Sequence, residues 1–119
     1  MVPIELVKTI VKAIDEKKGQ AITVLDIHAQ TGIADYFVIC TGNSAPQTKA
    51  IADFIEVTLE NQMDIHVLRR EGFQTGSWIL LDYGAVVVQI FKPEEREYYN
   101  LEKLWGDSPQ IPISDLLEV

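Results

Sequence analysis

Residues 76–91 read Gly76-Ser-Trp-Ile-Leu-Leu-Asp-Tyr-Gly-Ala-Val-Val-Val-Gln-Ile-Phe91, and they contain the strongest folding signal in the chain. β-Branched and aromatic residues lie on both sides of Tyr83-Gly84, which predicts a β-hairpin with a two-residue loop at that point. The loop fixes which residues face each other, so the register follows from it. The predicted pairs are Asp82 with Ala85, Leu80 with Val87, Trp78 with Gln89, Leu81 with Val86, and Ile79 with Val88.

Alternation along the two predicted strands sorts their side chains onto two faces of different character. One face is wholly apolar, which predicts the core. The other mixes apolar, acidic and amide side chains, which predicts a surface that is partly exposed and partly covered. The apolar face carries Ile79, Leu81, Val86, Val88 and Ile90, and the mixed face carries Trp78, Leu80, Asp82, Ala85, Val87 and Gln89.

Helical and strand-like segments alternate through the rest of the chain. Apolar residues at helical spacing predict helices over residues 4–18 and 44–61, and a third helix follows Pro93 as far as Trp105. Short runs rich in β-branched residues predict further strands. These strands cover residues 21–27, 36–40 and 65–70.

The order α-β-β-α-β-β-β-α predicts an α/β domain with a mixed sheet of about five strands. Two main helices cover one face, and a short C-terminal helix covers only part of the other, so the face with Trp78 and Leu80 stays partly open. An open apolar patch of this kind marks a binding site. We expect residues 1–107 to form a single domain and residues 108–119 to form an extended tail, whose mobility the sequence leaves open.

Charge and cysteine content narrow the functional classes. The 119 residues include 18 acidic and 10 basic side chains, and the formal net charge of −8 argues against direct recognition of nucleic acid. Such a charge suits a basic protein partner, although solubility alone would also explain it. The single cysteine, Cys40, cannot form an internal disulfide, and no apolar run is long enough to span a membrane. We therefore expect a reduced, cytoplasmic protein without membrane contact.

The turn Gly42-Asn-Ser44 lies between a predicted strand and the start of a predicted helix, where phosphate can bind. A nucleotidyltransferase would also need two carboxylates, two residues apart on a neighbouring strand, to hold Mg²⁺. No predicted strand has such a pair, and Asp82 stands alone. Ser44 as a helix cap explains the turn without a ligand. We predict no catalytic residue, cofactor or metal ion, and keep a Mg²⁺-dependent nucleotide-binding or nucleotidyl-transferring enzyme as the alternative.

Aromatic and acidic side chains concentrate in the C-terminal part of the chain. Aromatic anchors with acidic neighbours are typical of an interface to a basic protein. Packing of the last helix onto the sheet would account for Trp105 and one tyrosine without any partner. The aromatic residues are Trp78, Tyr83, Tyr98, Tyr99 and Trp105, and the acidic ones are Asp82, Glu94, Glu95, Glu97 and Glu102.

Three separated segments carry a likeness to a known family. They are Asp35-Tyr-Phe-Val-Ile-Cys-Thr-Gly-Asn-Ser44, Trp78-Ile-Leu-Leu-Asp-Tyr-Gly84 and Arg96-Glu-Tyr-Tyr-Asn-Leu-Glu-Lys-Leu-Trp-Gly-Asp107. In this order they resemble the ribosomal silencing factor (Iojap-like) family, from the first helix to about Asp107. The tail beyond Pro109 lies outside the shared pattern.

The resemblance implies a nucleotidyltransferase-like fold without the catalytic carboxylates, and a function by docking. Such factors bind protein L-fourteen of the large ribosomal subunit, block association with the small subunit, and repress translation under nutrient limitation. Family members also self-associate, so the open face makes room for a homodimer, and a homodimeric interaction module unrelated to ribosomes is a third option. Where the family pattern has Asp and His, this chain has Ala85 and Gln89. The resemblance assigns binding to Trp78, Leu80, Asp82, Tyr83, Tyr98 and Tyr99, with Glu94, Glu95 and Glu97 as outer charges.

Overall fold

The structure, a computed structural model, describes residues 3–30, 32 and 34–117. Residues 1 and 2 of the predicted domain and residues 118 and 119 of the predicted tail therefore lie outside the described residues. Among the described residues, no helix combines the length and apolar character that a membrane span requires. The elements are α1 (Pro3–Glu16), β1 (Gln20–Asp26), β2 (Tyr36–Thr41), α2 (Ala45–Met63), β3 (Arg69–Glu71), β4 (Trp78–Asp82), β5 (Val86–Phe91), α3 (Pro93–Tyr99), α4 (Leu101–Leu104) and α5 (Ile113–Leu117).

The five strands form one mixed sheet in the order β1-β2-β5-β4-β3. The central pair, β2 and β5, is parallel, and the other neighbouring strands are antiparallel. A parallel pair needs a long crossover connection, and α2 lies within the segment that joins β2 to β5. This confirms the predicted α/β class with a mixed sheet of five strands.

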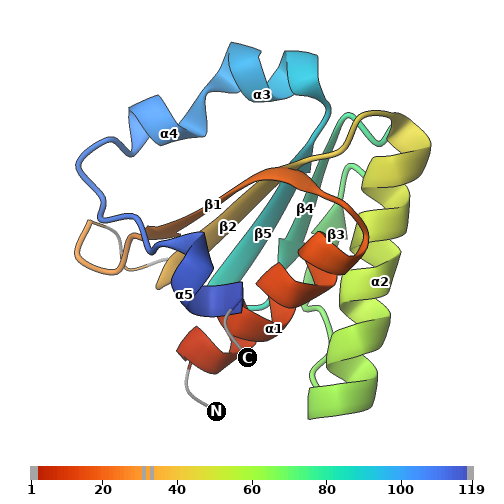
Figure 1. Ribbon diagram of the computed structural model, residues 1–119, viewed down its shortest axis with the longest axis horizontal. Helices are drawn as coiled ribbons and strands as arrows, with labels where there is room; N and C mark the ends of the chain where they lie inside the picture. The colour runs from red at the N-terminus through yellow and green to blue at the C-terminus, as the bar shows by residue number, and fades with distance from the viewer. Residues whose placement is uncertain (1–2, 31, 33, 118–119) are drawn as a thin grey trace.

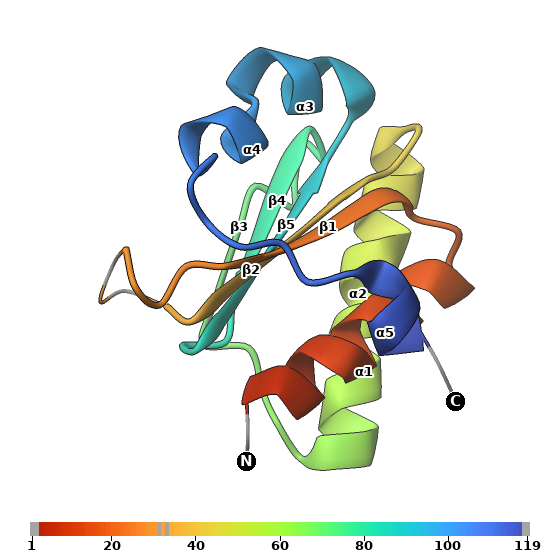
Figure 2. The ribbon, with the colours of Figure 1, turned by 60° about the vertical axis from the view of Figure 1, so that its left-hand side comes forward.

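The helices are unevenly distributed over the two faces of the sheet. Figure 2 shows α1, α2 and α5 on one side, while α3 and α4 lie on the other side at one end of the strands. The main core lies between the sheet and the helices α1 and α2. Its fully buried residues include Ile79, Leu81, Val86, Val88 and Ile90 of the hairpin, together with Ile10, Ile14, Ile51 and Ile55 of the helices. The predicted apolar face is therefore confirmed as core.

The hairpin register differs from the prediction. Leu80 pairs with Gln89 and not with Val87, and the N–H of Tyr83 donates to the carbonyl of Val86. The turn residues are thus 84 and 85, one position later than predicted. Gly84 adopts a φ of 88°, and its N–H donates to the Asp82 carboxylate at 2.8 Å, which fixes the turn there. Moving the turn by one position changes every pair by two residues, so the two faces keep their predicted members.

The predicted C-terminal helix is divided in two. Asn100 separates α3 from α4 with a left-handed φ of 43°, which asparagine tolerates better than most residues. Its side chain accepts a hydrogen bond from the N–H of Lys103 and so caps α4. The predicted strand over residues 65–70 is also shorter than expected, since β3 covers only Arg69–Glu71.

The prediction of an extended tail over residues 108–119 is wrong for residues 113–117, which form α5. The N–H of Asp26 donates to the carbonyl of Pro109, and the N–H of Ile111 donates to the carbonyl of Val24. Residues 109–111 therefore pair with the edge strand β1. The chain then turns into α5, which packs against α1 with Leu116 only 2% exposed. Figure 1 shows α5 beside α1. Burial of these apolar side chains stabilises α5. The sequence did not indicate this helix, because its apolar segment is short and two prolines precede it.

Candidate functional site

The open part of the sheet is centred on Trp78 of β4. Its ring stacks on Phe91 of β5 with centroids 4.9 Å apart, and Tyr99 of α3 packs on it at 4.6 Å. The indole Nε1 donates a hydrogen bond to Oε1 of Gln89 at 3.1 Å. Gln89 is itself only 4% exposed, so it supports the ring from below. Trp78 is therefore partly exposed and at the same time held in one orientation.

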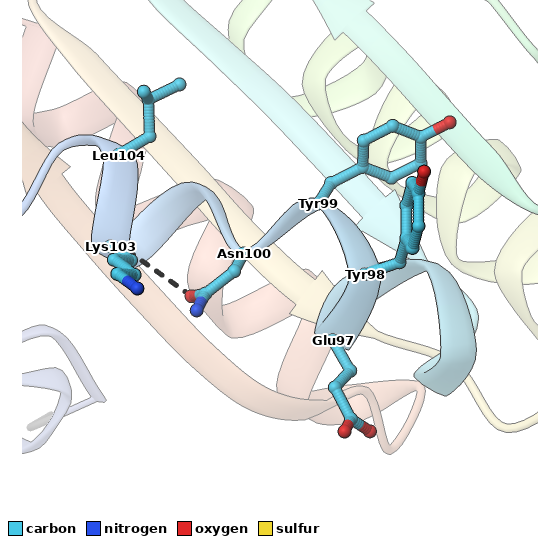
Figure 3. Close-up of a pocket in the computed structure, with 6 residues that line it drawn as sticks. All are labelled: Glu97, Tyr98, Tyr99, Asn100, Lys103 and Leu104. Carbon is cyan, nitrogen blue, oxygen red and sulfur yellow. Dashed lines mark hydrogen bonds between the residues drawn. The ribbon is translucent and has the colours of Figure 1, made fainter.

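The aromatic surface continues outward from Trp78 along α3. Tyr98 packs edge-on against Tyr99 with centroids 5.0 Å apart, and the two side chains are 78% and 46% exposed. Figure 3 shows both rings side by side, while Leu104 projects at the other end of the segment. An open hollow of about 570 Å³ lies along this segment, lined by Glu97, Tyr98, Tyr99, Asn100, Lys103 and Leu104. We call the surface formed by Trp78, Leu80, Tyr98 and Tyr99 the aromatic face.

A second hollow of about 300 Å³ adjoins Trp78 and Leu80 on the side of the edge strand β3. Glu71 and Gly72 complete its lining. Gly72 adopts a φ of 78°, and a Cβ atom there would lie 1.9 Å from the carbonyl oxygen of Trp78. Only glycine therefore allows this loop to approach β4 so closely. The result is a shallow apolar hollow, open at the sheet edge, next to a fixed indole ring.

The predicted acidic residues surround the aromatic face unevenly. Glu94 and Glu97 are exposed on α3, as expected of outer charges. Glu95 turns inward, and its Oε1 is buried without a hydrogen-bond partner among the described residues. The Asp82 side chain is 28% exposed and lies 3.9 Å from the guanidinium of Arg69. Asp82 thus serves the turn of the hairpin as well as the rim of the face.

Tyr83, which the resemblance assigned to the binding residues, does not lie on this face. Tyr83 follows Asp82 on the opposite side of the strand, so its ring points toward α2, where it is 8% exposed within the main core. Burial, together with the charges of Glu56 and Glu60, raises the pKa of its hydroxyl. That hydroxyl has no hydrogen-bond partner among the described residues. The structure therefore leaves Tyr83 and the inward-turned Glu95 carboxylate out of the face that the other predicted binding residues share.

The segment α3–α4 is fastened to the sheet by Arg96, which the sequence reasoning missed. Its guanidinium makes two hydrogen bonds to Glu102, at 2.7 and 3.2 Å, and it also donates to the hydroxyls of Thr41 and Thr23. The side-chain hydrogen bond from Arg96 holds the pKa of Glu102 below its ordinary value. The sequence signal for this pair was the opposite charge of Arg96 and Glu102, six residues apart on either side of Asn100. Trp105 adds an edge-on contact to Phe37 at 5.4 Å, as predicted for its packing role.

Neither Cys40 nor the start of α2 provides a reactive site. Burial raises the pKa of the Cys40 thiol to about 12, so it stays protonated and unreactive. Within the part of the chain that the structure describes, no three His, Cys, Asp or Glu side chains gather to hold a metal ion.

The turn at residues 42–44 is internally satisfied. Ser44 caps α2 by accepting from the N–H of Gln47 at 3.3 Å, and the Gln47 side chain accepts from the N–H of Asn43 at 2.7 Å. Behind them, the hydroxyl of Thr48 donates to the carbonyl of Gly76 at 2.6 Å, and Thr48 is fully buried. The loop that carries Gly76 therefore packs against the first turn of α2, where a nucleotide phosphate would have to bind. This geometry favours the capped helix over the nucleotide site.

Comparisons with known proteins agree with one another. The family model described as "Ribosomal silencing factor during starvation" matches residues 2–119, so the prediction that the tail lies outside the shared pattern is wrong. A ribosomal silencing factor of Halalkalibacterium halodurans is 42% identical over 113 residues, covering 95% of this chain and 96% of that protein. A crystal structure of a protein from Chromobacterium violaceum matches with a TM-score of 0.86 at 35% identity, over 94% of this chain and 91% of that one. The mouse protein named "Mitochondrial assembly of ribosomal large subunit protein 1" is 30% identical over 81% of this chain and 43% of its own length.

Proposed function

Because the chain belongs to the ribosomal silencing factor family, we propose that it docks on the large ribosomal subunit and keeps the small subunit from joining. The partner on the large subunit is protein L-fourteen, and the consequence is repression of translation when nutrients are limiting. The observation that carries the proposal is the fixed, half-covered Trp78 on a sheet face that α3 and α4 leave open.

The name of the mouse relative supports the large subunit as the partner, since that name refers to assembly of the large ribosomal subunit. The chain's net charge of −8 supports a basic protein surface as the point of attachment. Nucleic acid is not the direct target, because its phosphates would repel the acidic rim of the aromatic face. The protein acts in the cytoplasm, where the ribosomal subunits are.

Docking of this kind works by steric exclusion and involves no chemical step. The Trp78 ring is already held by Phe91, Tyr99 and Gln89, so binding costs little side-chain entropy. An apolar side chain of the partner would fill the hollow beside Leu80, and basic side chains would meet the rim. The proposed contact residues are Trp78, Leu80, Tyr98 and Tyr99, with Asp82, Glu94 and Glu97 as the surrounding charges, and Glu95 is left out because its carboxylate turns inward.

We also propose that the chain forms a homodimer. If the aromatic face mediated self-association, dimerisation and docking would compete for the same residues. If another surface did so, the dimer would be able to dock. Among the residues that the structure describes, no geometric observation favours the nucleotide-dependent enzyme, because the start of α2 is closed by its own side chains and by Gly76.

The test is co-sedimentation with purified large subunits, followed by addition of small subunits. We expect the protein to sediment with the large subunit and to reduce formation of joined ribosomes. Trp78→Ala should weaken binding by about 2 kcal/mol or more, as loss of a central aromatic anchor does. Val57→Ala on the outer side of α2 is the matched control, since it removes an exposed apolar side chain far from the aromatic face. Equal binding of Trp78→Ala and the unmodified protein would contradict the assignment of the face.

A further inference from the structure

Gln89 of β5 is a buried polar side chain at the base of the aromatic face, with 4% of its surface exposed. In the sheet it lies opposite Leu80 of β4 on one side and opposite Ile39 of β2 on the other, so apolar residues flank it in both directions. A buried amide in such surroundings normally has both of its ends hydrogen-bonded, because an unpaired end loses its hydration without compensation.

Only the oxygen end of this amide is paired within the described chain. The indole of Trp78 can donate but not accept, so the Gln89 atom that lies 3.1 Å from its Nε1 is Oε1, and this fixes the orientation of the amide. The nitrogen Nε2 has no hydrogen-bond partner among the described residues. It is not fully enclosed, because the fully enclosed side-chain atoms that lack a partner there are the Tyr83 hydroxyl and Glu95 Oε1. Nε2 is therefore an unused donor that a bound partner can reach.

The charges around the aromatic face indicate which acceptor suits this donor. An N–H group can donate to a carboxylate or to a neutral carbonyl oxygen. Asp82, Glu94 and Glu97 make the surroundings acidic, so a carboxylate brought to Gln89 would be repelled. A neutral carbonyl oxygen, from the main chain or from an amide side chain of the partner, accepts the hydrogen bond without adding charge.

We propose that Gln89 is a specificity-determining residue of the docking surface, which donates from Nε2 to a neutral carbonyl oxygen of the partner while its Oε1 holds the Trp78 indole. The ring then supplies apolar contact area, and the amide beside it supplies a directional bond. A surface that covers Gln89 without an acceptor would leave its N–H groups desolvated and unpaired, and it would be rejected. The inference rests on the proposed function, because the partner is the one that docks on the aromatic face.

A double-mutant cycle separates donation to the partner from support of the ring. Gln89→Met removes the amide at similar length, and it should weaken binding to large subunits by about tenfold, since the donor and the support of Trp78 are both lost. In a Trp78→Phe background no indole N–H remains to be supported. Gln89→Met should still weaken binding there by about threefold or more, because the bond to the partner is independent of the indole. Co-sedimentation titrations measure the four affinities.

Gln89→Glu tests the donor without disturbing the ring. It keeps an oxygen for the indole and exchanges the amide nitrogen for a second acceptor of nearly the same shape. At about pH 8, where the introduced carboxyl is ionised, binding to large subunits should weaken by about tenfold or more, because the carboxylate would face the partner's carbonyl oxygen. Hydrogen exchange of the indole N–H, followed by NMR and assigned with Trp105→Phe, should stay slow in Gln89→Glu and become faster in Gln89→Met.

Gln62→Met is the matched control, since it makes the same exchange at an exposed position of α2, on the other side of the sheet (Figure 2). The inference stands if Gln89→Met weakens binding in the Trp78→Phe background and Gln89→Glu weakens binding with its indole N–H still protected. If Gln89→Glu does not fold, the cycle alone decides.

The inference is overturned if Gln89→Met has no effect in the Trp78→Phe background, or if folded Gln89→Glu binds as the unmodified chain does. The proposed function would survive either result, because the unmodified chain would still dock. Failure of the unmodified chain to sediment with large subunits would refute the proposed function and the inference together.

Discussion

The two faces of the β4–β5 hairpin differ in what covers them, although they are built from alternate residues of the same strands. Leu81 and Ile90 point toward α1 and α2 and are fully buried. Trp78 and Leu80 point the other way, where α3 and α4 cover only part of the surface. Neighbouring residues of one strand therefore differ in environment, and under the proposed docking one holds the fold while the other presents the binding surface.

The largest expected effect on stability comes from truncating one of the two adjacent leucines, Leu80 and Leu81, which lie on opposite faces. Leu81→Ala should lower the free energy of unfolding by about 3 kcal/mol, because it removes a buried side chain and leaves a cavity. Leu80→Ala should lower it by about 1 kcal/mol or less, since its side chain is already partly in water. Urea denaturation followed by circular dichroism measures both values.

The same pair should behave in the opposite way in binding to the large subunit. Leu80→Ala should weaken binding, because Leu80 lines the hollow beside Trp78. Folded Leu81→Ala should bind with unchanged affinity. If both variants lost similar stability and similar affinity, the separation of the two faces would be wrong.

A second prediction concerns how the partial cover of the aromatic face is held. Arg96 is 13% exposed, and it links α3 to β1 and β2 through hydrogen bonds to Thr23 and Thr41 and to α4 through two more to Glu102. Arg96→Met should lower the free energy of unfolding by about 2 kcal/mol, the range for hydrogen bonds to charged groups. It should also weaken docking, because Tyr99 would no longer be held against Trp78.

The pH dependence of stability provides the control for this variant. The pKa of Glu102 is lowered in the folded protein, chiefly by its hydrogen bond from Arg96. The contribution of the pair is therefore complete above the ordinary glutamate pKa of 4.5 and is lost as the pH falls through the lower folded value. Arg96→Met should lack this loss of stability as the pH falls below 4.5, whereas Leu81→Ala should keep it. A parallel pH profile for Arg96→Met and the unmodified protein would contradict the role of the pair.

These expectations show what local sequence can and cannot predict. The two faces of the hairpin could be predicted because strand alternation is local. Their members stayed the same although the turn lies one position later than predicted. The place of Tyr83 could not, because the turn geometry decides whether the residue after Asp82 belongs to the loop or to the core. The Arg96 cluster joins residues far apart in the chain, from Thr23 to Glu102, so only tertiary structure brings it together.

The C-terminal tail gives the same lesson at a larger scale. Its apolar segment is too short to show a helical period, and its two prolines favour an extended chain. The helix α5 forms because Leu116 finds an apolar surface on α1, at the opposite end of the chain. Packing of this kind overrides weak local preference.

Tyr83 allows a third prediction with a smaller effect. Its buried hydroxyl has no hydrogen-bond partner among the described residues, so removing it removes an unsatisfied polar group. Tyr83→Phe should raise the free energy of unfolding by up to about 1 kcal/mol and leave docking unchanged. Thermal denaturation and co-sedimentation measure the two effects. Weaker docking of Tyr83→Phe would place the residue on the aromatic face after all.

The smallest effect is expected at Asp82, which lies at the rim and also holds the turn. Asp82→Asn removes the charge but keeps an oxygen that can accept the N–H of Gly84, so stability should be nearly unchanged. Association with the large subunit should slow by about two- to threefold at low salt, because a rim charge acts mainly by steering a basic partner. The difference should vanish at high salt, where the charge is screened.

Stopped-flow association rates at low and high salt measure this effect, and Glu5→Gln on α1 provides a charge-matched control on the other side of the sheet. Asp82→Lys would be a poorer test, because it also removes the acceptor of the Gly84 N–H and so mixes turn stability with steering. If Asp82→Asn slowed association equally at all salt concentrations, a direct contact would replace steering as its role. If Glu5→Gln slowed association as much as Asp82→Asn, the net charge of the chain, and not the rim of the aromatic face, would guide the approach to the ribosome.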